Sequence, residues 1–225
     1  MRFLCFHGRG TNAKTFESQT AAIRYELGDG HEFEFIEGTT PAELAPELKD
    51  TMTGDFTPLF YCHEMDPASV LGAGEQLSRY LDAEGPFDGV MGFSLGAAFI
   101  ATWMLDQVAR GRELPFRCAV FFSSSLPGNA AAMRAGQLEA VRGDSSAAGA
   151  GGGIIPIPTA HIWGTRDALA GDMPSELFSL CAPATRSVFV HGGGHEVPAS
   201  EANVTLAVNA IRRCILLAQE EEEDY

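Results

Sequence analysis

Short apolar runs that alternate with helical patterns constrain the fold of this chain more than any other feature of its sequence. Five runs have the length of buried strands, and they lie at residues 2–6, 89–93, 118–122, 159–163 and 187–190. A sixth segment, 32–36, alternates aromatic and acidic residues as a half-buried strand does. Strands separated by helices pair in parallel, so the pattern predicts an α/β fold with a mainly parallel central sheet flanked by helices.

Helices and irregular segments are predicted between the strands. Helical patterns occupy residues 15–27, 66–81, 97–108 and 199–217, and Asp66-Pro67 is a typical helix start. Residues 38–65 are predicted to be loop-like, with a short helix among them. The segment GDSSAAGAGGG at 143–153 is predicted to be a flexible loop. Residues 1–219 should form one domain, and 220–225 an acidic C-terminal tail beyond the last helix.

The charge of the chain excludes some partners. It has 30 Asp and Glu against 15 Lys and Arg, a net charge of −15, and Lys14 and Lys49 are its only lysines. Binding to phosphates requires a basic surface, which argues against nucleic acid and against anionic membranes as partners. The five cysteines form no CxxC pair, and no apolar run is long enough for a signal peptide or a membrane span. These features predict reduced thiols and a cytoplasmic protein.

The sequence GFSLG at 92–96 matches the G-x-S-x-G pattern. The pattern alone is weak, but here an apolar strand leads into it and a helical pattern leads out. That is the strand–turn–helix setting of a nucleophile elbow, in which glycines at 92 and 96 relieve crowding and Ser94 is exposed. The alternative is a glycine-rich turn whose serine only caps the helix.

Two later segments supply partners for a nucleophilic serine. A serine hydroxyl requires a base, and His195 follows the last predicted strand. A third group must orient the imidazole, and Asp167 follows the strand at 159–163, with Asp172 as the alternative acid. The order Ser94, Asp167, His195 is the chain order of the α/β-hydrolase triad. An oxyanion hole needs two backbone amides, and those of Leu95 and Arg9 are predicted to supply them.

Two other readings start from the same residues. Residues 8–15 differ from a P-loop by one position, because Ala13 stands where the second glycine belongs, and alanine would resist wrapping the backbone around a phosphate. His191 and His195 are four apart but separated by three glycines, so no helix presents them together to zinc. We therefore expect no metal and no cofactor.

Four motifs together resemble one family. HGRGTN near the N-terminus, GFSLG, WGTRD and GGGHEVP, in this order, are similar to those of the FSH group of serine hydrolases, a eukaryotic α/β-hydrolase family that is abundant in fungi. The resemblance spans the chain and implies that Ser94 is the nucleophile, Asp167 the acid and His195 the base. Some fungal members are similar to thioesterases that release polyketides, and others to short-chain carboxylesterases.

The resemblance leaves the substrate open. Segment 60–65 is more polar here than in relatives that line an acyl pocket with aromatic residues. We expect the substrate to contact four residues, which are Tyr61, His63, Ser124 and Val197. A small ester or an acyl thioester fits these features, and a carrier-protein-bound thioester would require a local basic patch, for which Arg110, Arg112 and Arg117 are candidates. A hydrolase-like fold that only binds its ligand is the remaining alternative.

Overall fold

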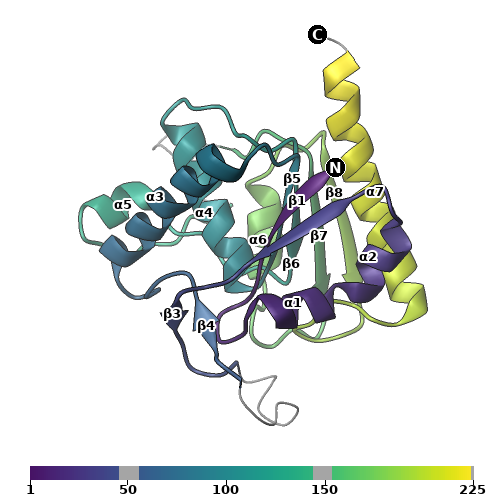
Figure 1. The fold of residues 1–225 in the computed structure, drawn as a ribbon, viewed down its shortest axis with the longest axis horizontal. Helices are drawn as coiled ribbons and strands as arrows, with labels where there is room; N and C mark the ends of the chain where they lie inside the picture. The colour runs from purple at the N-terminus through teal and green to yellow at the C-terminus, as the bar shows by residue number, and fades with distance from the viewer. Residues whose placement is uncertain (46–55, 144–153, 224–225) are drawn as a thin grey trace.

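The fold is built on one six-stranded parallel sheet (Figure 1). The computed structural model describes residues 1–45, 56–143 and 154–223. The strand order is β2-β1-β5-β6-β7-β8, and every neighbouring pair is parallel. The strands are β1 (Arg2–Phe6), β2 (Glu32–Ile36), β5 (Gly89–Phe93), β6 (Cys118–Phe122), β7 (Thr159–Gly164) and β8 (Arg186–His191). The predicted α/β class and the parallel sheet are confirmed.

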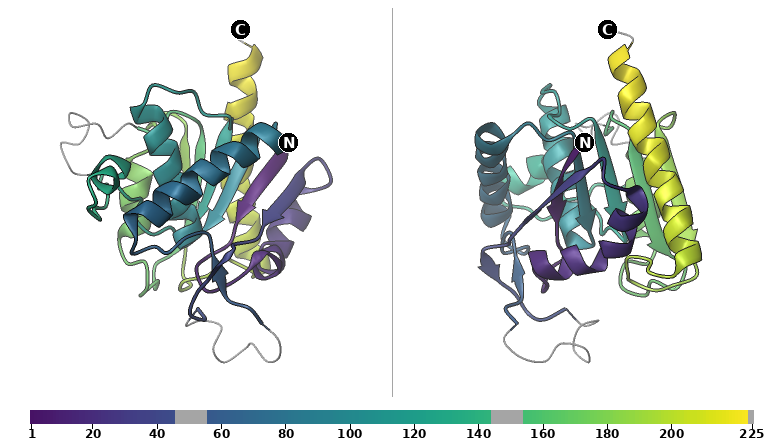
Figure 2. Two further views of the ribbon diagram at one scale, coloured as in Figure 1. Left: turned by 60° about the vertical axis from the view of Figure 1, so that its left-hand side comes forward. Right: turned by 45° about the vertical axis from the view of Figure 1, so that its right-hand side comes forward.

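Helices cover both faces of this sheet (Figures 1 and 2). One face packs against α1 (Ala13–Gln19), α2 (Ala21–Leu27) and α7 (Glu201–Glu223). The other packs against α3 (Pro67–Glu84), α4 (Leu95–Ala109) and α6 (Met173–Ser179), and the short α5 (Ala130–Arg134) lies against α3 and α4. The middle strands β5 and β6 are buried along their whole length, which is why they are apolar at consecutive positions rather than at alternate ones.

Several element boundaries differ from those predicted. Residues 15–27 form two helices instead of one, because the chain turns at Thr20, whose hydroxyl donates to the Phe16 carbonyl. The predicted loop at 38–65 contains a small antiparallel ladder of β3 (Thr40–Pro41) and β4 (Leu59–Phe60). No helix occurs at 38–45 or 56–65, the described parts of that segment, and residues 46–55 lie outside the described residues. The flexible loop predicted at 143–153 also falls outside them, except for Gly143.

The C-terminal helix is longer than predicted. Helix α7 continues to Glu223, so most of the acidic run belongs to the helix and not to a tail beyond it. Glutamate has a good intrinsic helix propensity, which accounts for the extension. In contrast, the predicted start of α3 is confirmed, because the Asp66 carboxylate accepts the Ala68 amide at 3.0 Å and Pro67 is the first helical residue.

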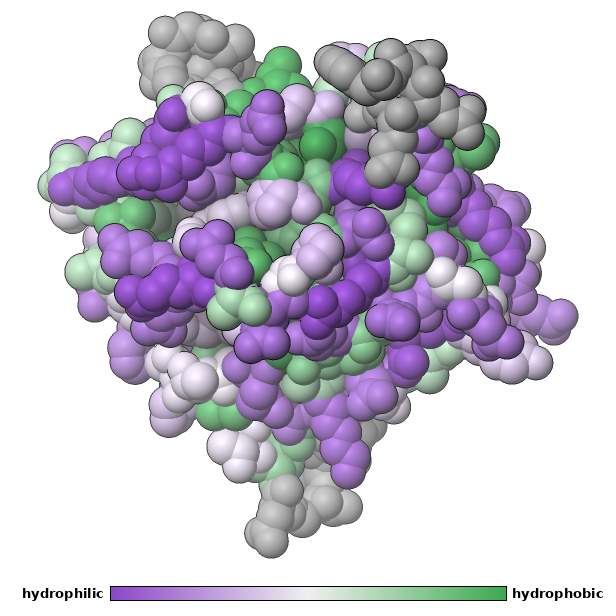
Figure 3. Space-filling model, turned by 45° about the horizontal axis from the view of Figure 1, so that its top comes forward, coloured by the Kyte–Doolittle hydropathy of each residue, from purple (hydrophilic) through white to green (hydrophobic). Residues whose placement is uncertain are grey.

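The surface is mostly hydrophilic on the face that Figure 3 presents, where hydrophobic residues form only small separate areas. None of the helices in the described part of the chain is both long enough and apolar enough to span a membrane.

The sheet has a topological switch point between β1 and β5. After β1 the chain forms β2 on one side of it, whereas β5 lies on the other side and is followed by β6, β7 and β8 in order. Phe6 pairs with Gly92, so the two carboxyl ends lie side by side. Open α/β sheets bind their ligands at this place, because the loops diverge there and leave a crevice.

One buried histidine makes the stability of this fold depend on pH. His161 on β7 packs between the Phe121 and Phe178 rings, and burial lowers its pKa from 6.5 to about 3. Below about pH 6.5 this imidazole is protonated in the unfolded chain but stays neutral in the folded protein. The stability of the fold therefore falls as the pH drops below that value. Between pH 7 and pH 5 the wild type should lose about 2 kcal/mol more unfolding free energy than His161→Gln does. Urea denaturation at both pH values measures this difference.

The control for this variant is His63→Gln, which replaces an exposed histidine. Its pH dependence should run parallel to that of the wild type. If the His161→Gln curve also runs parallel to the wild type, the buried imidazole does not contribute to acid destabilisation.

Candidate active site

Ser94 stands on a strained turn between β5 and α4. Its backbone angles are φ 54° and ψ −126°, a conformation that residues with a side chain seldom adopt. A Cβ at position 92 would lie 2.7 Å from the Ala97 Cα, and one at position 96 would lie 2.3 Å from the His7 carbonyl oxygen. Only glycine fits at 92 and 96, so this sharp turn requires both glycines of the motif.

A chain of short hydrogen bonds runs from Ser94 to Asp167. His195 Nε2 is 2.8 Å from Ser94 Oγ, and His195 Nδ1 is 2.8 Å from Asp167 Oδ2. An ionised carboxylate only accepts, so Nδ1 carries the proton and Nε2 is free to accept one from the serine. The histidine and aspartate side chains are buried, and the centroid of the imidazole ring lies 5.0 Å from that of the Phe93 ring.

Backbone amides hold the aspartate in place. Asp167 Oδ1 accepts the amides of Leu169 at 3.1 Å and Ala170 at 2.8 Å, which leaves Oδ2 for His195. Asp172, the alternative acid, is exposed and precedes α6. The oxygen that contacts the imidazole therefore belongs to Asp167.

The loops after β7 and β8 pack so closely that only glycine fits between them. A Cβ on Gly164 would lie 2.3 Å from the Gly193 carbonyl oxygen, and the Arg166 amide donates to that same carbonyl at 3.0 Å. This contact brings Asp167 and His195 together although they belong to different strands. The carbonyls of Gly193 and Gly194 thus pack against Gly164 and join the two loops, and this segment is a loop and not a metal-binding helix.

The loop after β1 lies against the serine. A Cβ on Gly8 would be 3.5 Å from the Ser94 Cβ. The Gly10 amide donates to Leu59 and the Thr11 amide to Gly8, whereas those of Arg9 and Leu95 donate to no backbone carbonyl among the described residues. Leu95 follows the serine in sequence, and Arg9 follows Gly8, which packs against the serine. An oxyanion hole formed by these two amides stays a prediction.

His7 fixes this loop. Its Nε2 accepts the Gly38 amide at 3.0 Å, so its Nδ1 carries the proton and donates to the Gly8 carbonyl at 2.8 Å. Burial lowers the pKa of this imidazole, which favours the neutral form that the two bonds require. His7 thus connects the end of β1 with the segment after β2, and its hydrogen bonds are made to these loops and not to Ser94.

An apolar cavity of about 240 Å³ begins beside Leu95. The residues that line it include Phe60, Cys62, Leu95, Phe99, Leu126, Met133 and Leu138. Sequence reasoning identified segment 60–65 but missed Phe99, Leu126, Met133 and Leu138. The sequence could have indicated Phe99 as a wall residue, because it follows the nucleophile by only five residues on α4. Segment 126–138 contains no pattern that would indicate a wall of this cavity.

The four predicted substrate-contacting residues lie apart from that cavity. Tyr61 lines a neighbouring apolar cavity, where its hydroxyl accepts the His7 amide at 2.7 Å and donates to the Ile36 carbonyl. His63 is exposed and lines a shallow depression beside Arg9. Ser124 is buried with its hydroxyl donated to the Ser125 carbonyl, and Val197 is buried against the α7 side of the sheet. Their role in substrate binding stays a prediction.

Metal ligands are not grouped at this site. Within residues 1–45, 56–143 and 154–223, no set of three or more His, Cys, Asp and Glu could hold an ion. His191 Nδ1 accepts the Gly193 amide at 3.1 Å, and burial lowers the pKa of this imidazole. His191 thus shapes the loop that carries His195.

A serine, a histidine and an aspartate that meet at the carboxyl ends of parallel strands, with the serine on a strand–turn–helix elbow, define the α/β-hydrolase class. The chain belongs to the FSH1 serine hydrolase family, whose model matches residues 1–206. It is a serine hydrolase that cleaves ester bonds.

Fungal enzymes and solved structures are similar to the chain. Esterase FPY3 of Fusarium mangiferae is 36% identical over 200 residues, 88% of each chain. Hydrolase phiM of Fungal sp. is 31% identical over 205 residues, 88% of this chain and 86% of its own. A Mesorhizobium loti carboxylesterase superposes with TM-score 0.62 at 14% identity, over 94% of this chain and 88% of its own. Arabidopsis thaliana SOBER1 superposes with TM-score 0.59 at 16% identity, over 96% of this chain and 99% of its own.

Proposed function

We propose that Ser94, His195 and Asp167 are the catalytic triad of a carboxylesterase or thioesterase that works through an acyl-enzyme. The observation that carries the proposal is the unbroken chain of hydrogen bonds from the serine hydroxyl to the buried carboxylate. Asp167 keeps the proton on His195 Nδ1 and stabilises the cation that forms when Nε2 takes up the serine proton.

The reaction then follows in two halves. Ser94 Oγ gives its proton to His195 Nε2 and attacks the carbonyl carbon, and the resulting oxyanion accepts the Arg9 and Leu95 amides. When the bond to the leaving group breaks, His195 returns its proton to the departing alkoxide or thiolate. In the second half a water molecule gives a proton to His195 and attacks the acyl carbon, after which the proton returns to Ser94 and the acid leaves.

The acyl group is proposed to occupy the cavity beside Leu95. This cavity of about 240 Å³ has mostly apolar walls, which suits a short or medium apolar acyl chain, and one of its wall residues is Leu95, the residue that follows the nucleophile. Relatives named as esterase and hydrolase support ester cleavage in general. We further propose that thioesters are accepted, because the triad attacks both kinds of carbonyl, and that release of an acyl or polyketide product is the biological role.

A fluorophosphonate probe tests the proposal. The wild type should be labelled on Ser94, located by peptide mass spectrometry, and Ser94→Ala should lose labelling and p-nitrophenyl acetate turnover while its circular dichroism is unchanged. Ser175→Ala replaces an exposed serine on α6 and should behave as the wild type.

Two results would contradict the proposal. Labelling that persists in Ser94→Ala would place the nucleophile elsewhere. No labelling of the wild type, beside a control hydrolase that labels, would favour a hydrolase-like module that only binds its ligand.

A further inference from the structure

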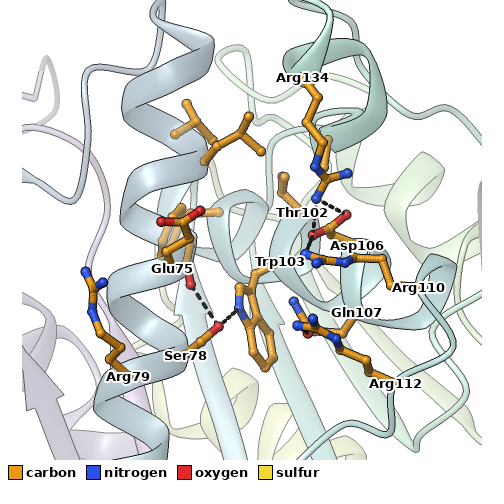
Figure 4. Close-up of a pocket in the computed structure, with 15 residues that line it drawn as sticks. Glu75, Ser78, Arg79, Thr102, Trp103, Asp106, Gln107, Arg110, Arg112 and Arg134 are labelled. Carbon is orange, nitrogen blue, oxygen red and sulfur yellow. Dashed lines mark hydrogen bonds and ion pairs between the residues drawn. The ribbon is translucent and has the colours of Figure 1, made fainter.

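A second, larger cavity lies between α3, α4 and α5, and the proposed reaction does not use it (Figure 4). Its volume is about 600 Å³. Trp103 of α4 contributes one wall, and its indole N–H is already donated to Ser78 of α3 at 3.0 Å. The indole therefore presents only apolar ring surface to a ligand, and the polar groups that line the cavity come from all three helices and from Arg110 and Arg112 just after α4.

Those polar groups carry an excess of positive charge. Four arginines line the cavity, and they are Arg79, Arg110, Arg112 and Arg134. Two carboxylates, Glu75 and Asp106, oppose them. This excess is unusual for a chain with a net charge of −15 and only 15 Lys and Arg.

The arginines are not equally engaged. Asp106 accepts Arg134 through both oxygens, at 2.7 and 2.6 Å, and approaches Arg110 only at 3.5 Å (Figure 4). Arg112 donates to the neutral Gln107 side chain at 3.2 Å. Each of these two guanidinium groups, Arg110 and Arg112, contacts one side chain in the described part of the chain, so several of its five N–H donors remain for an incoming anion.

This cavity adjoins the proposed acyl cavity. The two share three wall residues, Val70, Phe99 and Thr102. Helix α4 lies along both, since it starts directly after Ser94 and ends at Ala109. At about 1.5 Å per residue, Asp106 and Arg110 lie roughly 18 and 24 Å along the helix from the nucleophile. A substrate that extends along α4 from the serine would need about this length to place its far end at the arginines.

We propose that the cavity between α3, α4 and α5 is a subsite for an elongated substrate with a carboxylate or phosphate at its far end, held by Arg110 and Arg112. Arginine recognises both groups through paired N–H donors, so the shared chemistry is an oxyanion far from the scissile carbonyl. The inference rests on the proposed function, because it names the substrate of the same nucleophile.

The basic patch predicted from the sequence also included Arg117. This residue does not line the cavity, and its guanidinium donates to the Ala218 carbonyl.

Matched substrates test the subsite. We would compare p-nitrophenyl acetate with two long p-nitrophenyl esters of equal length, one ending in methyl and one in carboxylate. The variant Arg110→Gln/Arg112→Gln should lower kcat/KM on the carboxylate ester about tenfold, since each partly exposed pair is worth a factor of a few. Acetate and the methyl-ended ester should change less than about twofold, and added salt should weaken the wild type's preference for the carboxylate.

A second pair of substrates identifies the source of the anion. Acyl pantetheine thioesters with and without the 4′-phosphate place the charge on the leaving group instead of the acyl chain. Loss of preference for the phosphate in the double variant would assign the site to the leaving group, and loss of preference for the carboxylate would assign it to the acyl chain. Arg213→Gln removes the same charge from an exposed position on α7 and should leave all ratios unchanged.

Binding without turnover separates this inference from the proposed function. In a Ser94→Ala/Trp163→Phe background Trp103 is the single tryptophan, and its emission should change at lower concentrations of a long α,ω-dicarboxylate than of the matching monocarboxylate. The subsite would be overturned if the dicarboxylate and the monocarboxylate bound with equal affinity and the double variant kept the wild-type ratios of kcat/KM between charged and uncharged substrates. If p-nitrophenyl acetate were turned over without Ser94, the proposed function itself would fail instead.

Discussion

Replacing Asp167 with asparagine is expected to lower kcat/KM on p-nitrophenyl esters by about 10³- to 10⁴-fold without unfolding the protein. Oδ1 already accepts two backbone amides, from Leu169 and Ala170, so the asparagine oxygen must stay at that position. Its NH₂ group then faces His195 Nδ1 and donates to it. The imidazole is driven into the tautomer with the proton on Nε2, which cannot accept the proton of Ser94.

The matched control for this variant is Asp172→Asn, because Asp172 is the other acid that the sequence offers. It is exposed and should keep wild-type kcat/KM. Thermal unfolding of both variants should stay close to that of the wild type. An Asp167→Asn enzyme with more than about a tenth of wild-type activity, or a large loss in Asp172→Asn, would contradict the assignment of the acid.

Gly96→Ala is expected to cost about 3 kcal/mol of unfolding free energy and to lower Tm by roughly 6–12 °C. The added methyl group would lie 2.3 Å from the His7 carbonyl oxygen and 2.8 Å from that of Phe6. Both are backbone atoms of β1 or the loop after it, so the start of α4 must move away from the sheet. This movement displaces the Leu95 amide as well, so activity should fall in the fraction that still folds.

Gly72→Ala is the control for that substitution. Gly72 lies on α3, and a Cβ there would meet no atom within 4 Å apart from its chain neighbours and the backbone of its own helix. Replacing a helical glycine with alanine at an open position should stabilise the protein by about 0.5–1 kcal/mol. Opposite signs for the two variants in differential scanning calorimetry are the expected result. Equal effects would show that helix propensity and not the contact with β1 controls the outcome at position 96.

The sequence predicted the sheet and the chain order of the site because both depend on local signals. A run such as 118–122 is apolar at every position only if both of its faces are covered, and GFSLG places two glycines where the turn has no room for a side chain. Ser94, Asp167 and His195 each follow a strand, so parallel pairing brings them to one edge. The family assignment follows from the same motifs and is confirmed.

What the sequence could not predict depends on partners far along the chain. The aromatic ring of Tyr61 suggested a substrate contact, but its hydroxyl is bound to His7 and Ile36, 54 and 25 residues away. The break between α1 and α2 was invisible because Phe16, Ile23 and Leu27 keep helical spacing across it. Helices α5 and α6 span only five and seven residues, too few for a periodic pattern.

The order in which the site's parts occur along the chain has a consequence for biosynthesis. The serine elbow leaves the ribosome about a hundred residues before His195, and the sheet edge that carries His195 is covered by α7, the last helix. If Ser94 depends on His195 as proposed, it has no base until α7 has packed on β7 and β8. We therefore expect hydrolytic activity to begin only after β8 and α7 have been synthesised and have packed on the sheet.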